Sequence, residues 1–414
     1  MNCLLSEQKE NQSPFLISSD ESLSFAEADK RVNGICISLL NANLKGQRFA
    51  IQSENTISYI LHLIASWRIA AVPCLISPRY TREQTKICVA QLNCMQAINL
   101  RRSIPPSDTS FAEWPAAHAN IIFSSGTTAD PKAIVHSFGN HLASAEGLNE
   151  VIKLDSDDRW LLSLPLYHIG GLAILFRTLR AGSAIVIPDD NASIPKSISE
   201  HHVTHCSLVP TQLYRLVNDP ALKEPKVILI GGAALNETLF EEAKENGLHI
   251  YTSYGSSEMT STICCSGLND AKLSSGKLLK NRDLKINDDG EILVKGDCLF
   301  QGYVHGGEIV CPLEDGWFRT GDIAELVNDN LHLNGRIDNM FISGGENIHP
   351  EEIERCIRNF PGVEEVEVKA EEDSEFGQRP VAYISGTYDK DQLINFLKAN
   401  IEAYKVPRLK ALDS

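Results

Sequence analysis

Two apolar, β-prone runs enclose a short polar loop between residues 121 and 135 of this chain. The first run contains Ile-Ile-Phe and the second Ala-Ile-Val, and the loop between them combines hydroxyl side chains with glycine, proline and lysine. This pattern predicts a strand, a tight loop and a second strand. Backbone N–H groups and a lysine ammonium both attract anions, so the loop is a candidate polyphosphate site. Its candidate ligands are Ser124, Ser125, Gly126, Thr127, Thr128 and Lys132.

The loop differs from the P-loop pattern G-x-x-x-x-G-K-[ST], because its glycine spacing is different and no helical pattern follows at once. Taken alone, the stretch fits an ordinary hairpin turn rich in serine and threonine equally well. The rest of the chain has to decide between these two interpretations.

Helical and strand patterns alternate through most of the chain, which predicts an α/β fold with parallel sheets. Helices are expected at residues 24–44, 56–69, 81–92, 137–148 and 172–179, and strands at 49–52, 71–76, 160–165, 183–188, 203–209, 227–230 and 249–254. Beyond residue 276, short alternating strands indicate a β subdomain. The last part reads as α+β, with helices at 350–357 and 389–397 and strands at 363–368 and 381–384. We therefore expect a large N-terminal domain of mixed or parallel sheets, residues 1–335, and a small mobile α+β domain, residues 336–414.

The composition narrows the class of protein. The 414-residue chain has a net charge of −16 and no long basic run, which argues against a nucleic-acid or anionic-membrane surface. Its 11 cysteines include no C-x-x-C pair, as suits a reducing cytosol. The longest apolar stretch, residues 59–76, is interrupted by His62, Arg68 and Pro73, so we expect no membrane insertion. We expect a cytoplasmic protein, and the sequence leaves undecided whether it forms a homo-oligomer.

Four segments, in order, resemble the signatures of the adenylate-forming superfamily, which includes the acyl-CoA synthetases. They span residues 124–132, 251–258, 315–322 and 335–348. The first departs from the usual form, because Ala129 and Ala133 stand where the family has glycine. The resemblance implies an AMP-forming acid–thiol ligase that uses ATP, Mg²⁺ and coenzyme A. It also implies two steps: a carboxylate attacks the α-phosphorus of ATP, and a thiolate then displaces AMP.

The resemblance also assigns roles to individual residues. It places Tyr254 against adenine, Ser256 on phosphate, and Glu258 on Mg²⁺. Asp322 would accept hydrogen bonds from the ribose hydroxyls, and Arg336 would also reach the nucleotide. The remaining expected positions are the catalytic Lys132, the nucleotide-binding Gly232, Ala233 and Gly255, the hinge Asp338, and Gly345, whose loop would enter for the second step.

Within the superfamily, the likeness is greatest to the o-succinylbenzoate–CoA ligases of menaquinone biosynthesis. Residues 164–172, 207–213, 230–234 and 343–348 carry it. This substrate has an aromatic ring and two carboxylates, of which only the succinyl carboxylate is activated. Arg177, on an otherwise apolar helix, would hold the spare carboxylate by charge-assisted hydrogen bonds, unless it extends to the surface instead. His168, Gly255 and Thr262 complete the expected substrate site, although a packed core histidine is an alternative for His168.

The family has a Gly-Lys motif beyond a segment like Tyr404-Lys405-Val406-Pro407, whose lysine bridges the carboxylate and the α-phosphate. The sequence given stops at Ser414 without that motif. We therefore expect a small domain truncated before the motif, and a slow first step. Two other functions stay open: a ligase for another aryl or medium-chain acid, and a degenerate adenylate-binding protein without efficient turnover.

Overall fold

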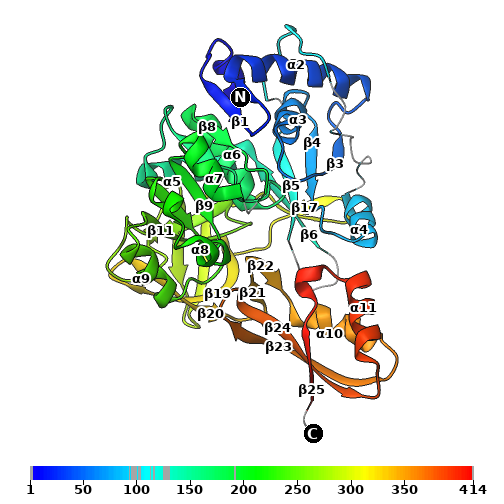
Figure 1. Cartoon of the computed structure of the whole chain (residues 1–414). Helices are drawn as coiled ribbons and strands as arrows, with labels where there is room; N and C mark the ends of the chain where they lie inside the picture. Colours follow the sequence, from blue (N-terminus) through cyan, green and yellow to red (C-terminus); the bar gives the residue numbers. More distant parts are fainter. Residues whose placement is uncertain are drawn as a thin grey trace.

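The computed structural model describes residues 3–92, 94, 100, 104–111, 113–114, 117–124, 131–190 and 193–412. It has the expected α/β architecture, with parallel and antiparallel sheets (Figure 1). The last part of the chain, orange to red in Figure 1, forms a separate lobe at the lower end of the molecule. Among the described residues, no helix is long and apolar enough to cross a lipid bilayer.

The first sheet has six strands in the order β17-β16-β6-β5-β4-β3. Strands β3, β4 and β5 are parallel, whereas β5 and β6 form the antiparallel pair that the sequence predicts around the polar loop. The helices before β5 are α1 (Leu4–Glu7), α2 (Phe25–Asn41), α3 (Ile57–Arg68) and α4 (Arg82–Leu92). The strands are β3 (Arg48–Gln52), β4 (Val72–Ile76), β5 (His118–Ser124), β6 (Lys132–Ser137), β16 (Gly302–His305) and β17 (Glu308–Val310).

The second sheet has nine strands in the order β13-β12-β11-β10-β9-β7-β8-β1-β2. Its central strands, from β11 to β1, are parallel. The strands are β1 (Pro14–Ile17), β2 (Ser22–Ser24), β7 (Arg159–Leu161), β8 (Ala184–Val186), β9 (His205–Leu208), β10 (Val227–Ile230), β11 (Ile250–Ser256), β12 (Ser261–Cys265) and β13 (Lys277–Leu278). The accompanying helices are α5 (Phe138–Ile152), α6 (Ile169–Ala181), α7 (Ile194–His201), α8 (Pro210–Leu216), η2 (Pro220–Lys223) and α9 (Glu237–Glu245).

Two smaller sheets follow. The β subdomain comprises β14 (Arg282–Ile286), β15 (Glu291–Gly296), β18 (Leu313–Glu314), β19 (Trp317–Val327) and β20 (Asn330–Arg336). The terminal lobe comprises β21 (Phe341–Ser343), β22 (Glu346–Ile348), α10 (Pro350–Arg358), β23 (Val363–Asp373), β24 (Gly377–Gly386), α11 (Lys390–Asn400), η3 (Ala403–Lys405) and β25 (Arg408–Ala411). It has its own apolar core, built from these strands and helices. The exact domain boundary between residues 335 and 336 stays a prediction.

Aromatic packing holds the helices of the large lobe together. Trp67 of α3, Trp114, Phe138 of α5 and Phe176 of α6 are buried, with ring centres 4.7–6.4 Å apart. The Trp67 indole N–H donates a 2.6 Å hydrogen bond to the carbonyl of Ala119. Large buried rings in edge and stacked contacts contribute strongly to a core, so this cluster fixes α6 against α3 and α5.

The predicted strand at 160–165 is shorter in the structure and ends at Leu161. After Leu162 N–H, which still donates to the Val186 carbonyl of β8, the side chain of Asn55 binds the continuation: Asn55 Nδ2 donates to the carbonyls of Leu162 and Leu164, and Asn55 Oδ1 accepts from Leu166 N–H. Because Asn55 satisfies backbone groups beyond Leu161, the chain can leave the sheet there. The hairpin of β1 and β2 and the helix α9 did not follow from the sequence patterns.

Candidate active site

The turn between β11 and β12 gathers candidate residues from three elements. Glu258, in this turn, accepts a 2.8 Å hydrogen bond from the hydroxyl of Tyr303 on β16. Lys132, the first residue of β6, has its ammonium 5.5 Å above the centre of the Tyr303 ring. Burial, together with the Glu258 charge, raises the pKa of Tyr303, so this phenol stays a donor. Glu258 and Lys132 therefore both lie beside Tyr303, the carboxylate at its hydroxyl and the ammonium over its ring.

The backbone of this turn depends on Gly255, because a Cβ there would collide with the carbonyl of Ser261. The hydroxyl of Ser256 accepts a hydrogen bond from Met259 N–H at 3.2 Å and is half-buried.

The predicted polyphosphate loop is only partly described. Ser124, at the end of β5, pairs with Lys132 at the start of β6, so the two ends of the loop lie side by side. The next strand across, β16, pairs with β6 and brings Tyr303 opposite Ile134. The four other predicted ligands, Ser125, Gly126, Thr127 and Thr128, lie outside the described residues.

A second group of residues surrounds Asp322. Its two carboxylate oxygens accept hydrogen bonds of 2.6 Å from the Tyr254 hydroxyl and from Arg336 Nη1. Arg336 also binds Asp338 with both Nε, at 2.7 Å, and Nη2, at 3.0 Å. Burial raises the pKa of Asp322, and Arg336 opposes this effect. The guanidinium therefore joins the expected ribose ligand to the expected hinge residue.

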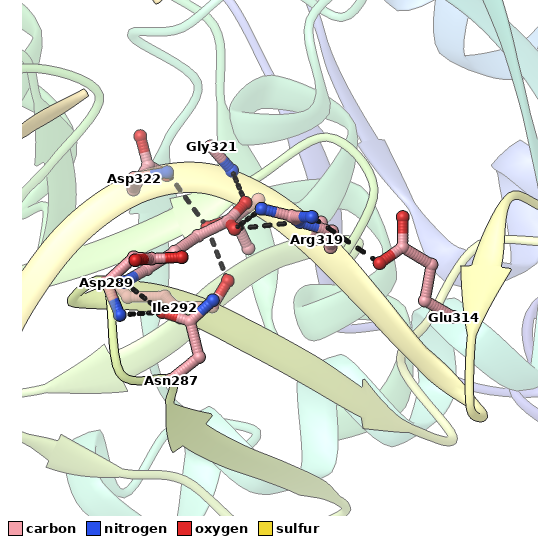
Figure 2. A network of polar contacts seen from close by, with 9 residues as sticks. Asn287, Asp289, Ile292, Glu314, Arg319, Gly321 and Asp322 are labelled. Atoms are coloured by element: carbon pink, nitrogen blue, oxygen red, sulfur yellow. Dashed lines mark hydrogen bonds and ion pairs between the residues drawn. The ribbon is translucent and has the colours of Figure 1, made fainter. Parts of the chain in front are cut away.

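The backbone before Asp322 is fixed by the β subdomain (Figure 2). The buried carboxylate of Glu291 accepts from Arg319 Nε at 2.8 Å and from Gly321 N–H at 3.0 Å. The Thr320 hydroxyl donates to the carbonyl of Ile292 and accepts from Asp322 N–H. These contacts attach the backbone next to Asp322 to strand β15.

Arg177 is buried in α6, where it is 4% exposed. Its Nη2 donates to the hydroxyls of Ser261 and Thr262, each at 3.2 Å, and its guanidinium lies 5.4 Å from the ring centre of Trp160. In the described part of the chain, no carboxylate forms an ion pair with it, and its Nε has no hydrogen-bond partner. Burial lowers the pKa of Arg177 to about 9. A buried guanidinium is costly unless paired, so the site favours an anion.

One contact between the terminal lobe and the large lobe lies at the turn between β21 and β22 and at the first residue of β22. Glu346 accepts a 3.1 Å hydrogen bond from Arg79 Nη1, and its other oxygen lies 3.4 Å from His168 Nε2 at the start of α6. Gly345 has φ +87°, and a Cβ there would lie 3.0 Å from the Val209 side chain. Gly232, with φ +79°, faces the same Val209 side chain, with half-buried Ala233 next to it. Residues from both lobes thus meet around Val209 and His168.

The two late lysines are held inside the terminal lobe. Lys405 is buried and contacts Glu352 at 2.8 Å and Glu402 at 3.1 Å. Lys410 contacts Glu371 at 2.6 Å. Both ammonium groups are paired with carboxylates of their own lobe.

The structure therefore brings the predicted residues into three neighbouring groups: Lys132 with Glu258, Tyr254 with Asp322 and Arg336, and Arg177 with Thr262. The sequence interpretation missed Tyr303, Arg79, Glu346 and Val209 as contacts of these groups. Of these, only Glu346 could have been singled out from the sequence, because it directly follows the Gly344-Gly345 pair of the fourth signature.

Known proteins share this architecture. A family model described as AMP-binding enzyme matches residues 6–110 and 99–304. The 2-succinylbenzoate–CoA ligase of Escherichia coli K12 is 31% identical over 408 residues, covering 94% of this chain and 88% of that protein.

Two solved structures of o-succinylbenzoate–CoA synthetase from Bacillus subtilis are also similar. A double mutant bound to its product analogue OSB-NCoA matches with a TM-score of 0.92 at 26% identity, over 100% of this chain and 95% of that one. The complex with the acyl-adenylate intermediate OSB-AMP matches with a TM-score of 0.75 at 27% identity, over the same shares of both chains. The family match covers well over half of the chain, and this protein belongs to the AMP-binding enzyme family.

Proposed function

We propose that this protein is an AMP-forming acid–CoA ligase that converts o-succinylbenzoate, ATP and coenzyme A to o-succinylbenzoyl-CoA, AMP and pyrophosphate. Relatives and structural neighbours named for this reaction support it. The observation in this chain that carries the choice of acid is Arg177, a buried guanidinium without a carboxylate partner among the described residues. An acid with a second carboxylate supplies the missing anion, whereas a simple aryl or fatty acid does not.

The nucleotide has a matching set of groups. Asp322 is the acceptor for the ribose hydroxyls, Arg336 lies beside it, and Tyr254 is the aromatic surface for adenine. Asp322 accepts a hydrogen bond from each of these side chains, one on each oxygen, and a carboxylate has further lone pairs for the ribose hydroxyls. The loop that contains Ser124 and Lys132 is the phosphate site.

The donor set at Glu258 fits Mg²⁺. Magnesium is commonly bound through one or two carboxylates together with substrate phosphates and waters, so one glutamate beside a phosphate site is sufficient. A bound Mg²⁺ neutralises charge that develops on pyrophosphate. Tyr303 holds the Glu258 carboxylate, and Lys132 adds a positive charge over the Tyr303 ring.

The arrangement of the two lobes supports the thioester-forming step. The match to the complex with a CoA-type product analogue has a TM-score of 0.92, against 0.75 for the acyl-adenylate complex of the same enzyme. A whole-chain score falls when one lobe is rotated, so the lobes of this protein are arranged as in the former complex. The Gly345 loop lies beside Val209 and His168, which supports a path for the pantetheine thiol between these residues. Asp338, bound to Arg336, is the proposed hinge.

The proposal places the enzyme in the cytoplasm and in menaquinone biosynthesis, with a homo-oligomer still open. Two assays test the reaction. Pyrophosphate release should require ATP, Mg²⁺ and o-succinylbenzoate, and mass spectrometry should detect the thioester only when coenzyme A is added. ATP binding without pyrophosphate release would instead support a degenerate adenylate-binding protein. Faster turnover of benzoate or octanoate would support a ligase for another acid.

A further inference from the structure

The turn that carries Glu258 has an unfavourable backbone. Two successive residues, Thr260 and Ser261, have φ values of +51° and +92°. Positive φ is uncommon for residues other than glycine, and it is most costly for a β-branched residue such as threonine. Such conformations persist where surrounding contacts impose them. The question is which contacts hold this turn.

Buried groups bind the turn at three of its carbonyls. His136 Nε2 lies 2.7 Å from the carbonyl of Ser257, and the Ser144 hydroxyl donates to the carbonyl of Thr260 at 2.6 Å. The carbonyl of Glu258 accepts from Phe300 N–H at 2.7 Å. Two of the three donors are side chains of β6 and α5, and neither belongs to a family signature quoted above.

His136 is itself oriented by a buried chain of hydrogen bonds. A carbonyl only accepts, so His136 Nε2 carries the proton and its Nδ1 accepts from the Asn120 amide at 3.2 Å. Asn120 Oδ1 in turn accepts from His141 Nε2 at 2.7 Å. All three side chains are fully or almost fully buried. All three contacts are satisfied when His141 donates to Asn120, Asn120 donates to His136, and His136 donates to the carbonyl of Ser257.

The His141 end of this chain of hydrogen bonds lies against α6, the helix that carries Arg177 of the proposed substrate site. The His141 ring stacks on Phe176 with centres 3.9 Å apart and an angle of 7°. Phe176 immediately precedes Arg177 on α6. The polar chain therefore runs from the helix of Arg177 to the residue before Glu258. Buried polar groups are costly unless bonded, so three of them in a row between two candidate sites point to a function beyond packing.

We propose that His136, oriented by Asn120 and His141, is a positioning residue that fixes the Ser257 carbonyl and thereby aims the Glu258 carboxylate at the metal-bound nucleotide. This inference rests on the proposed function. It assigns no chemistry to His136 itself, which acts through the backbone of the turn. Groups that orient a metal ligand typically change metal affinity or activity by about 10- to 100-fold when removed.

The test compares two replacements of His136 in the full chain. His136→Leu removes the N–H that binds Ser257, whereas the longer amide of His136→Gln can still donate there. The probe is α,β-methylene-ATP, which cannot form an acyl-adenylate because its bond between the α-phosphorus and the bridging carbon is not cleaved. Calorimetry with this analogue gives the Kd without Mg²⁺ and the Kd with Mg²⁺, and hence their ratio. We expect His136→Leu to reduce this ratio roughly tenfold or more and to raise KM for Mg·ATP, and His136→Gln to recover most of both.

His62→Leu is the matched control. His62 is also buried and contacts a backbone carbonyl, that of Ser58 at 2.7 Å, in a helix that carries no candidate site residue. A melting temperature lowered equally in both leucine variants, with the Mg²⁺ ratio unchanged in His136→Leu, would overturn the inference. If His136→Leu does not fold, His136→Asn decides in the same way, because its amide is too short to reach Ser257.

The wild-type protein separates this inference from the proposed function. If it binds the ATP analogue without any effect of Mg²⁺, the proposed function fails together with the inference. If it shows the Mg²⁺ effect and the His136 variants match it, only the positioning role is wrong.

Discussion

Arg79 donates a 3.1 Å hydrogen bond to Glu346, which lies 267 residues further along the chain. The contact joins the large lobe to the first residue of β22, and His168 approaches the same carboxylate. Because the two residues belong to different lobes, a rotation of one lobe against the other would break the contact. If that arrangement serves the thioester step, the contact should matter for this step alone.

Glu346→Gln should therefore slow thioester formation from supplied acyl-adenylate and coenzyme A, and leave pyrophosphate release unchanged. The pair is partly exposed, so the expected loss is only about two- to fivefold. Arg358→Ala, which removes an ion pair inside the terminal lobe, is the control and should change neither step. An equal loss in both steps would contradict the assignment.

The same carboxylate predicts a pH effect on stability. Burial alone would raise the pKa of Glu346, but His168, Arg79 and Lys405 outweigh it and lower the pKa below its ordinary value of 4.5. A carboxyl group with a lowered pKa stabilises the folded arrangement above its ordinary pKa, and this contribution disappears as the pH falls through the lowered value.

We therefore expect the melting temperatures of wild type and Glu346→Gln to differ above the ordinary pKa of 4.5 and to converge as the pH falls below it. Differential scanning calorimetry across this range measures the effect. A difference that grows toward low pH would show that Glu346 is not held in its charged form.

Replacing Arg177 should separate substrate binding from stability. Arg177→Met should raise KM for o-succinylbenzoate by about ten- to a hundredfold, because a charge-assisted hydrogen bond is lost, while KM for ATP stays unchanged. The free protein should be no less stable, since the lost cation is buried without a carboxylate partner among the described residues. Arg180→Met, an exposed position on the same helix, is the control. A fall in melting temperature with equal effects on both substrates would indicate a folding defect.

Replacing Glu258 should cause a large loss of Mg²⁺-dependent activity, and replacing Tyr303 a smaller one. Glu258→Gln should abolish most Mg²⁺-dependent pyrophosphate release with little change in melting temperature, because the carboxylate lies in a half-buried turn. Tyr303→Phe keeps the ring near Lys132 and removes one hydrogen bond, so a smaller loss of about tenfold is expected. Initial rates measured against Mg²⁺ concentration check both, with the exposed Glu308→Gln as control. Normal Mg²⁺ dependence in Glu258→Gln would remove it from the metal site.

Local patterns predicted much of this structure. Periodic apolar residues gave α2, α3 and α4 to within a few residues, and the helix expected from residue 389 is α11, which Asp389 caps by accepting from Gln392 N–H. Glycine and hydroxyl residues at fixed spacing also leave a local signal, and this signal marked the loop motifs as candidates.

Contacts between distant strands could not be read in this way. Tyr303 reaches Glu258 because β16 pairs with β6, and no local pattern fixes this partner. The role of His136 was equally hidden, since its acceptor lies 121 residues away. The one available signal was a histidine within an apolar run that is buried on both faces of its strand, which indicates a buried hydrogen bond. Such signals mark a residue without naming its partner.

The most direct test of the account pairs two acids with two proteins. The first acid is o-succinylbenzoate, and the second is 4-oxo-4-phenylbutanoate, which keeps the activated succinyl carboxylate and lacks the one on the ring. The measurement is kcat/KM for thioester formation by wild type and by Arg177→Met. We predict that wild type prefers o-succinylbenzoate by about ten- to a hundredfold and that the variant loses this preference by slowing only with that acid. An unchanged preference in Arg177→Met, or equal use of both acids by wild type, would contradict the account.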